Sequence, residues 1–200
     1  MQVALLNLEV SMNKKIIRIL LLVSLIFLAS TLILPLWDIA IFAPQYPEGL
    51  NLQIWLNKIS GDLNNINILN HYVGMKAITP SDIPELVYFP KLIAGILVVG
   101  AVALAWPHLV SIGLYFLSFA AFSLFALYDF WKWEYDYGHN LSPDAPIKVP
   151  GMSYQPPLFG SETLLNISIY SYPAIGGWLM MVSFLAVLYV LYLRAKELWG

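Results

Sequence analysis

Four long apolar runs restrict what this chain can fold into more than any other feature. They occupy residues 16–36, 86–106, 109–130 and 173–193, and each approaches the ~20 apolar residues that a helix needs to cross a bilayer. The chain is 60% hydrophobic, with a mean hydropathy of +0.72, whereas soluble domains are roughly 45–50% apolar. We therefore expect an all-α integral membrane protein with four transmembrane helices in one membrane domain, residues 1–200.

The first apolar run could also belong to a signal peptide, because Lys14, Lys15 and Arg18 precede it. The run is longer than the ~7–15 apolar residues usual in a signal peptide, and no small-x-small cleavage pattern follows it. We expect an uncleaved anchor. Met12 resembles a start in its own right, so residues 1–11 are read as an upstream extension or a short tail.

Basic residues near both ends of the chain predict its orientation. Lys and Arg concentrate on the cytoplasmic side of membrane proteins, and here they flank the first run and follow the fourth as Arg194 and Lys196. We expect both termini in the cytoplasm, with the protein in the bacterial inner membrane. Residues 106–108 then form a tight cytoplasmic turn. Residues 37–85 and 131–172 become long periplasmic loops that fold over each other as a small cap.

Composition and motifs exclude several classes of function. A net charge of −2 gives no electrostatic case for binding nucleic acid. The chain has no cysteine, which excludes disulfides, thiolate copper sites, iron–sulfur clusters and covalent c-type haem within it. It has no Gly-rich phosphate loop, GxSxG elbow or HExxH motif, so we predict no catalytic residues. No acidic residue lies at mid-depth of an expected span, which argues against an ion-coupled transporter.

A short segment after the third apolar run is the strongest candidate for chemistry. Residues 131–140 place Glu134, Asp136 and His139 among four aromatic residues at the expected membrane boundary. Carboxylate and imidazole groups together can hold copper(II), zinc, iron or manganese. The alternative is an aromatic belt with a solvated acidic rim, which is common where a helix leaves the bilayer.

A second candidate lies in the first loop, where we expect a helix over residues 64–78. His71 and Met75 are spaced to share one face of that helix. Imidazole and thioether groups suit copper, copper(I) in particular, and Met152 in the other loop could add a second sulfur. Alternatively, Met75 fills a gap in the core and His71 bonds a backbone carbonyl. If the loops pack together, His71 and His139 meet at one metal site.

Four short sequence segments in the loops resemble those of a known protein family. They lie at residues 43–50, 67–75, 133–140 and 145–157. The chain resembles the NosB-like accessory membrane proteins encoded in clade II nitrous oxide reductase gene clusters. This resemblance implies a role in denitrification beside a periplasmic copper enzyme, a copper chaperone or permease subunits, either in copper handling or in anchoring the reductase. It brings no established catalytic residues to this chain.

Two other functions remain open at this point. The chain could be a metal-free structural subunit that docks a partner in a respiratory or transport complex of the membrane. Aromatic side chains dominate interface hot spots, and the loops offer such anchors at Tyr46, Trp55, Trp131, Trp133 and Tyr154. The third function is that of a membrane metalloenzyme with its centre near the outer face.

Overall fold

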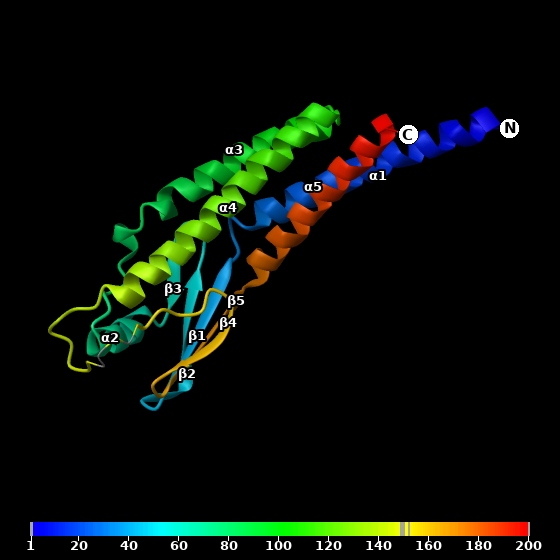
Figure 1. Cartoon of the computed structure of the whole chain (residues 1–200). Helices are drawn as coiled ribbons and strands as arrows, with labels where there is room; N and C mark the ends of the chain where they lie inside the picture. Colours follow the sequence, from blue (N-terminus) through cyan, green and yellow to red (C-terminus); the bar gives the residue numbers. More distant parts are fainter. Residues whose placement is uncertain (1, 149–150, 152, 200) are drawn as a thin grey trace.

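Long helices form one part of the molecule and a β-sheet with a short helix forms the other (Figure 1). The computed structural model describes the backbone of residues 2–148, 151 and 153–199, and the side chains of residues 14–148, 151 and 153–197. The four long helices are α1 (Gln2–Ser30), α3 (Glu85–Ala105), α4 (Leu109–His139) and α5 (Ile175–Trp199). The short elements are α2 (Leu63–Val73) and a 3-10 turn, η1 (Pro80–Asp82).

The expectation of an all-α fold is wrong, because both long loops contribute strands to one sheet. The strands are β1 (Trp37–Ala43), β2 (Tyr46–Ile54), β3 (Ile59–Gly61), β4 (Gly160–Leu164) and β5 (Ile167–Pro173). Their order is β3-β2-β1-β5-β4, and every neighbouring pair is antiparallel. The pairing of β1 with β5 joins the segment before α3 to the segment before α5.

The number of spans also differs from the expectation. Three of the described helices, α3, α4 and α5, are long and apolar enough to cross a membrane, so they indicate a membrane location. The run at 16–36 is not among them: α1 ends at Ser30, its described side chains begin at residue 14, and a turn leads directly into β1 at Trp37. Within the described residues, four transmembrane helices are therefore not found. The described part of α1 instead packs along α5 and α3, with Ile17, Leu21 and Leu28 fully buried.

Among the described residues, the bundle core is apolar apart from Thr31, which bonds the backbone of its own helix, and one hydroxyl network. Ser24 on α1 lies 2.9 Å from the hydroxyl of Tyr115 on α4 and 2.9 Å from the hydroxyl of Ser183 on α5. Ser183 also donates to the backbone carbonyl of Ser24 at 2.8 Å. All three side chains are completely buried, so the network fixes how three helices pack in an interior where few other polar groups specify register.

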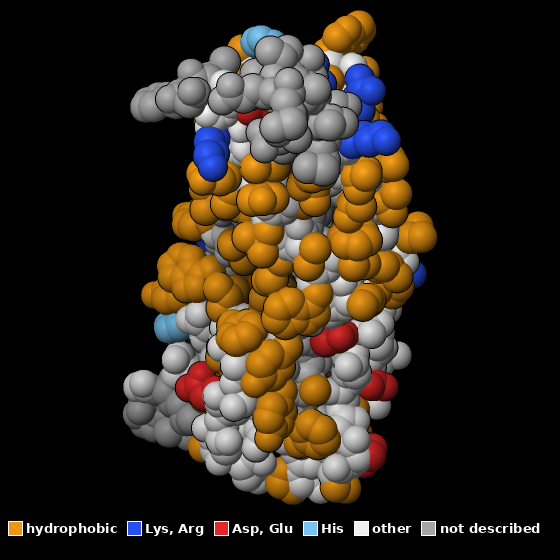
Figure 2. Space-filling view, turned by 90° about the vertical axis from the view of Figure 1, so that its right-hand side faces the viewer, with side chains coloured by type: hydrophobic (Ala, Val, Ile, Leu, Met, Phe, Trp, Pro, Cys, Tyr) orange, Lys and Arg blue, Asp and Glu red, His pale blue; other side chains and the backbone are white. Residues whose placement is uncertain are grey.

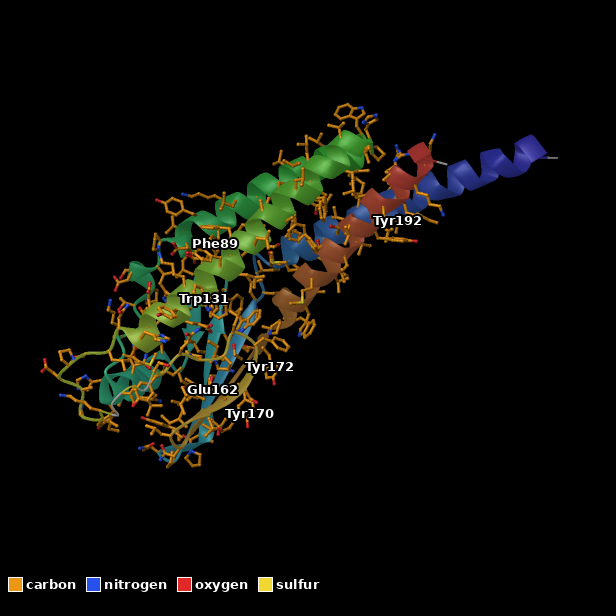
Figure 3. The ribbon with its side chains drawn as sticks, in the orientation of Figure 1. Phe89, Trp131, Glu162, Tyr170, Tyr172 and Tyr192 are labelled. Atoms are coloured by element: carbon orange, nitrogen blue, oxygen red, sulfur yellow. The ribbon has the colours of Figure 1, made fainter. Side chains whose placement is uncertain are left out.

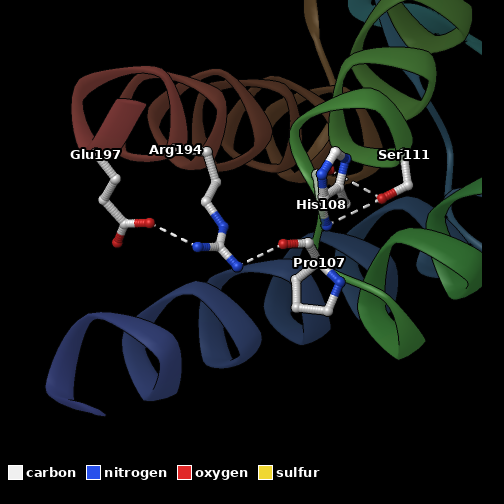
Figure 4. A network of polar contacts seen from close by, with 5 residues as sticks. All are labelled: Pro107, His108, Ser111, Arg194 and Glu197. Atoms are coloured by element: carbon white, nitrogen blue, oxygen red, sulfur yellow. Dashed lines mark hydrogen bonds and ion pairs between the residues drawn. The ribbon is translucent and has the colours of Figure 1, made fainter. Parts of the chain in front are cut away.

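The connection between α3 and α4 has the predicted length, residues 106–108. His108 caps α4: its side chain accepts from the backbone N–H of Val110, and its own N–H donates to Ser111 (Figure 4). Arg194 near the end of α5 donates to the carbonyl oxygen of Pro107 and pairs with Glu197. The turn is therefore tied to the neighbouring helix as well as capped.

The sheet has one apolar face and one open face. The apolar side chains of β1, β2 and β5 pack with α2 and with the end of α4 in a second core, separate from that of the bundle. The buried members of this core from the sheet and α2 are Ile39, Leu50, Leu52, Ile66, Val73 and Ile169. Strands with one buried face alternate in polarity, and residues 167–173 show that alternation in their burial, whereas in β1 only Ile39 and Ala43 are buried.

Candidate functional site

Helix α4 continues well past the apolar run that was expected to end it. Its 31 residues correspond to ~46 Å of helix, whereas the hydrocarbon core of a bilayer is ~30 Å thick. The apolar part, residues 109–130, accounts for the crossing. Residues 131–139, expected as a loop, form a helical extension in which Trp133 and Tyr137 pack against the core beneath the sheet. We call residues 131–139 the α4 extension and place it outside the bilayer.

The second loop returns along this extension and touches its backbone. The N–H of Tyr154 donates to the carbonyl oxygen of Gly138 at 2.9 Å. A Cβ atom added at Gly138 would lie 2.4 Å from the backbone of Gln155, so only glycine permits this approach. The contact closes the loop over the buried face of the α4 extension.

Glu134 lies on that buried face and is the most unusual polar group in the described structure. Its side chain is 0% exposed, and neither carboxylate oxygen has a hydrogen-bond partner among the described residues. Burial away from water raises its pKa from 4.5 to about 8, because desolvation penalises the charged form. Glu134 therefore carries a proton at neutral pH.

The other two members of the predicted cluster do not accompany Glu134. Asp136 and His139 are exposed, because they lie two and five residues after Glu134, and neither spacing brings a side chain back to the same side of a helix. The ring of His139 stacks on Tyr135 with centroids 3.9 Å apart, and its Nδ1 lies 3.1 Å from the backbone oxygen of Tyr135. The spacing thus divides the predicted cluster between the interior and the surface.

His71 and Met75 also differ from the expected arrangement. The helix expected over residues 64–78 ends at Val73, where Gly74 adopts a left-handed conformation with φ 84°. Gly74 is an αL C-cap, a conformation that glycine adopts without steric penalty. His71 is exposed in the last helical turn, while Met75 lies beyond the helix and packs against the second core. The two side chains therefore do not share a continuous helical face.

Metal binding stays a prediction for these six positions. Met152 lies outside the described residues. Among the residues that are described, no three His, Cys, Asp or Glu side chains come together as a group that could hold a metal ion. His71 and His139 each remain exposed at the surface of the sheet-bearing part.

A large apolar cavity lies where the bundle meets the sheet. It measures about 640 Å³, within the ~300–1,000 Å³ typical of ligand pockets. Its walls come from the start of α3, the middle of α4, the start of α5 and the nearby ends of β1 and β2. Phe89, one of the wall residues, projects from α3 toward α4 in Figure 3 and meets Phe122 edge-on.

Two carboxylates line the same cavity, Glu85 at the start of α3 and Asp129 near the end of the apolar part of α4. Sequence reasoning missed this site. The only signal in the sequence was that both acids lie beside the ends of apolar runs. That position alone is explained by side chains that extend to the membrane interface. Tertiary packing, which the pattern does not show, brings Glu85 and Asp129 to one cavity.

Comparison with known proteins adds no family. No protein-family model matches the chain, and no curated protein sequence matches it significantly. The function must therefore be argued from the geometry of the structure and from the four loop segments.

Proposed function

We propose that this chain is an accessory membrane protein of a periplasmic copper respiratory system of the nitrous-oxide-reducing kind. In this role its helices hold it in the bilayer, and its sheet docks the soluble copper reductase. Two observations support this proposal: the three candidate spans, and the resemblance of the four loop segments to NosB-like accessory membrane proteins. We favour anchoring over copper handling, because the sheet offers an open aromatic face, whereas no three His, Cys, Asp or Glu side chains gather within the described part of the chain.

The surface charge supports an orientation with the sheet in the periplasm. Figure 2 shows a broad apolar belt, with most of the visible Lys and Arg side chains above it and most of the visible Asp and Glu side chains below it. The basic end carries the termini, as the positive-inside rule favours for the cytoplasm. The acidic end carries the sheet.

The open face of the sheet is the observation on which the docking proposal depends. Asp38 pairs with Tyr172 and Ala40 with Tyr170 across β1 and β5, so these side chains share the face opposite the buried Ile39. Tyr170 and Tyr172 are each 42% exposed and lie on the side of the sheet away from α2 (Figure 3). Phe42 and Phe159 meet them edge-on, with ring centroids 5.8 Å and 5.2 Å apart.

This aromatic face suits a protein partner whose docking surface is apolar with a basic rim. Tyrosine and phenylalanine are enriched at the cores of interfaces, and the polar hydroxyl of tyrosine allows its ring to be exposed to water before binding. The two loops that build the sheet contain nine acidic residues and four lysines. The docking surface of the reductase should therefore combine apolar contacts with a basic rim.

Copurification tests the proposal. The tagged chain is expressed with the reductase, extracted in mild detergent and assayed for bound reductase. Replacing Tyr170 and Tyr172 together with alanine should reduce the recovered reductase about tenfold or more, since ~1.4 kcal/mol gives a factor of ten. Tyr192→Ala is the matched control, because Tyr192 is exposed on α5, far from the sheet (Figure 3). Failure of the unaltered chain to recover reductase, or full recovery with the double variant, would refute docking.

The copper prediction has a separate test. Elemental analysis of the purified protein after copper loading measures the bound metal. If His71 and His139 hold copper, the His71→Ala/His139→Ala double variant should lose it. Equal copper content in both proteins would remove the predicted site without affecting the docking proposal.

A further inference from the structure

We infer that the cavity between the bundle and the sheet binds a phospholipid with a primary ammonium headgroup, a phosphatidylethanolamine. The inference requires the protein to lie in a bilayer, but it is independent of docking at the open face of the sheet. It rests on the position of the cavity, the composition of its wall and the charges around its rim.

The cavity reaches both the hydrocarbon and the membrane interface. Leu124 on α4 and Leu185 on α5 line it and are 70% and 60% exposed, so it opens on the lipid-facing surface of the bundle. Trp37, Trp55 and Trp133 line its other end beside the sheet. Tryptophan is enriched at the level of lipid headgroups. An occupant that enters from the bilayer therefore places its chain between the helices and its head near the tryptophans.

The wall is almost entirely apolar, which suits an acyl chain better than a water-soluble metabolite. Phe122, Met180 and Phe184 contribute to it from α4 and α5. Methionine and aromatic side chains adapt to flexible apolar groups. Polar ligands need several hydrogen-bonding groups in the wall, and here the polar groups lie mainly at the headgroup end.

Two carboxylates line that end, and two lysines lie next to residues that line it. Glu85 and Asp129 line the cavity, and within the described residues neither forms an ion pair. Lys132 follows Asp129 by three residues on α4, the spacing of neighbours on a helix. Lys58 lies 4.2 Å from the centre of the Trp55 ring. Carboxylates suit an ammonium group and lysines suit a phosphate, so the rim matches a zwitterionic head that carries both.

The ammonium requirement separates the candidate lipids. Phosphatidylglycerol has the phosphate but no cation to meet the two carboxylates. Phosphatidylcholine has a cation but no N–H to donate to them. Phosphatidylethanolamine supplies three N–H donors on one charged nitrogen, and hydrogen bonds between charged groups are about twice as strong as neutral ones.

Native mass spectrometry of the full chain, released from nanodiscs with equal amounts of phosphatidylethanolamine and phosphatidylglycerol, tests the inference. The unaltered protein should retain one phosphatidylethanolamine, preferred about tenfold over phosphatidylglycerol. The Glu85→Gln/Asp129→Asn variant keeps the shape of both side chains but removes their charges, so it should retain either lipid equally. Equal retention of the two lipids by the unaltered protein would overturn the inference.

A pair of alanine variants tests whether the cavity itself holds the lipid. Ala126 lines the cavity, whereas Ala121 on the same helix is exposed and does not. Ala126→Trp should abolish retention of both lipids, and Ala121→Trp should retain phosphatidylethanolamine as the unaltered protein does. Retention by Ala126→Trp would overturn the inference, as would loss in Ala121→Trp as complete as in Ala126→Trp. Retention of an isoprenoid quinone from native membranes in place of phospholipid would also overturn it.

Discussion

Replacing Glu134 with glutamine should change how the stability of the protein depends on pH. The folded protein raises the pKa of this carboxyl from 4.5 to about 8. Because the raised pKa lies above that of the unfolded chain, the folded state holds the proton when the unfolded state has lost it. Stability therefore falls as the pH rises from about 4.5 to about 8, and the loss is small below that range.

The magnitude follows from the size of the shift. A tenfold change in proton affinity corresponds to about 1.4 kcal/mol, so the complete effect is at most about 5 kcal/mol. About 3–4 kcal/mol of it falls between pH 5 and pH 8. Since 1 kcal/mol moves the melting temperature by about 2–4 °C for a chain of this length, the unaltered protein should melt roughly 10 °C lower at pH 8 than at pH 5.

Thermal melting in detergent over this pH range measures the effect. The Glu134→Gln variant keeps the shape of the side chain but cannot ionise, so its melting temperature should change much less. Asp136→Asn is the matched control, because Asp136 is exposed two residues away on the same helix, and it should follow the unaltered protein. Parallel pH profiles for the unaltered protein and Glu134→Gln would refute the assignment of a buried, uncompensated carboxyl.

Three further substitutions test the packing. Tyr115→Phe removes one hydroxyl from the network in the bundle and should cost about 1 kcal/mol, seen as a melting temperature lower by about 2–4 °C; an unchanged value would contradict a structural role for the network. Gly138→Ala should destabilise the protein and expose the second loop to protease, despite the better helix propensity of alanine. Gly113→Ala is the control: no atom lies within 4 Å of the new Cβ, so this variant should be neutral or stabilising. Equal effects of the two substitutions would contradict the close contact at Gly138. Arg194→Ala should cost about 1–2 kcal/mol in melting experiments by leaving the carbonyl of the α3–α4 turn without its donor, and full stability would show that the turn does not depend on this bond.

The apolar runs at 86–106, 109–130 and 173–193 predicted the positions of α3, α4 and α5, because length and hydropathy alone specify such helices. The strands were missed for a different reason. Residues 37–43 directly follow an apolar run and were assigned to the long loop at 37–85. Strand pairing between segments more than 120 residues apart also leaves no local signal, since it depends on tertiary contact.

The candidate site shows the same limit. Glu134, Asp136 and His139 were grouped by closeness in sequence, but a helix sends neighbouring residues in different directions. His71 and Met75 were placed on one helical face, although Gly74 lies between them and ends the helix. A glycine at this point is a recognised stop signal, so the sequence contained the information needed to correct that prediction.

The junction between the two parts of the molecule bears on any docked partner. The N–H of Leu36 donates to the carbonyl of Ile54 at 2.8 Å, and the N–H groups of Ala174 and Gly176 donate to the carbonyls of Leu36 and Pro35 at 3.0 Å and 2.9 Å. Residues 35–36, directly before β1, are thus bonded to the end of β2 and to the start of α5, and β1 itself pairs with β5. A partner held on the open face would keep a fixed height and tilt relative to the bilayer, because bending at this junction would break several buried hydrogen bonds at once. Inserting a flexible glycine–serine segment between Pro173 and Ala174 removes only the bonds at the start of α5, while the α4 extension still packs against the sheet core. It should leave the affinity for a docked partner nearly intact and loosen its orientation, measurable as a broader distance distribution between spin labels on the bundle and on the partner. An unchanged distribution would contradict a role for these bonds.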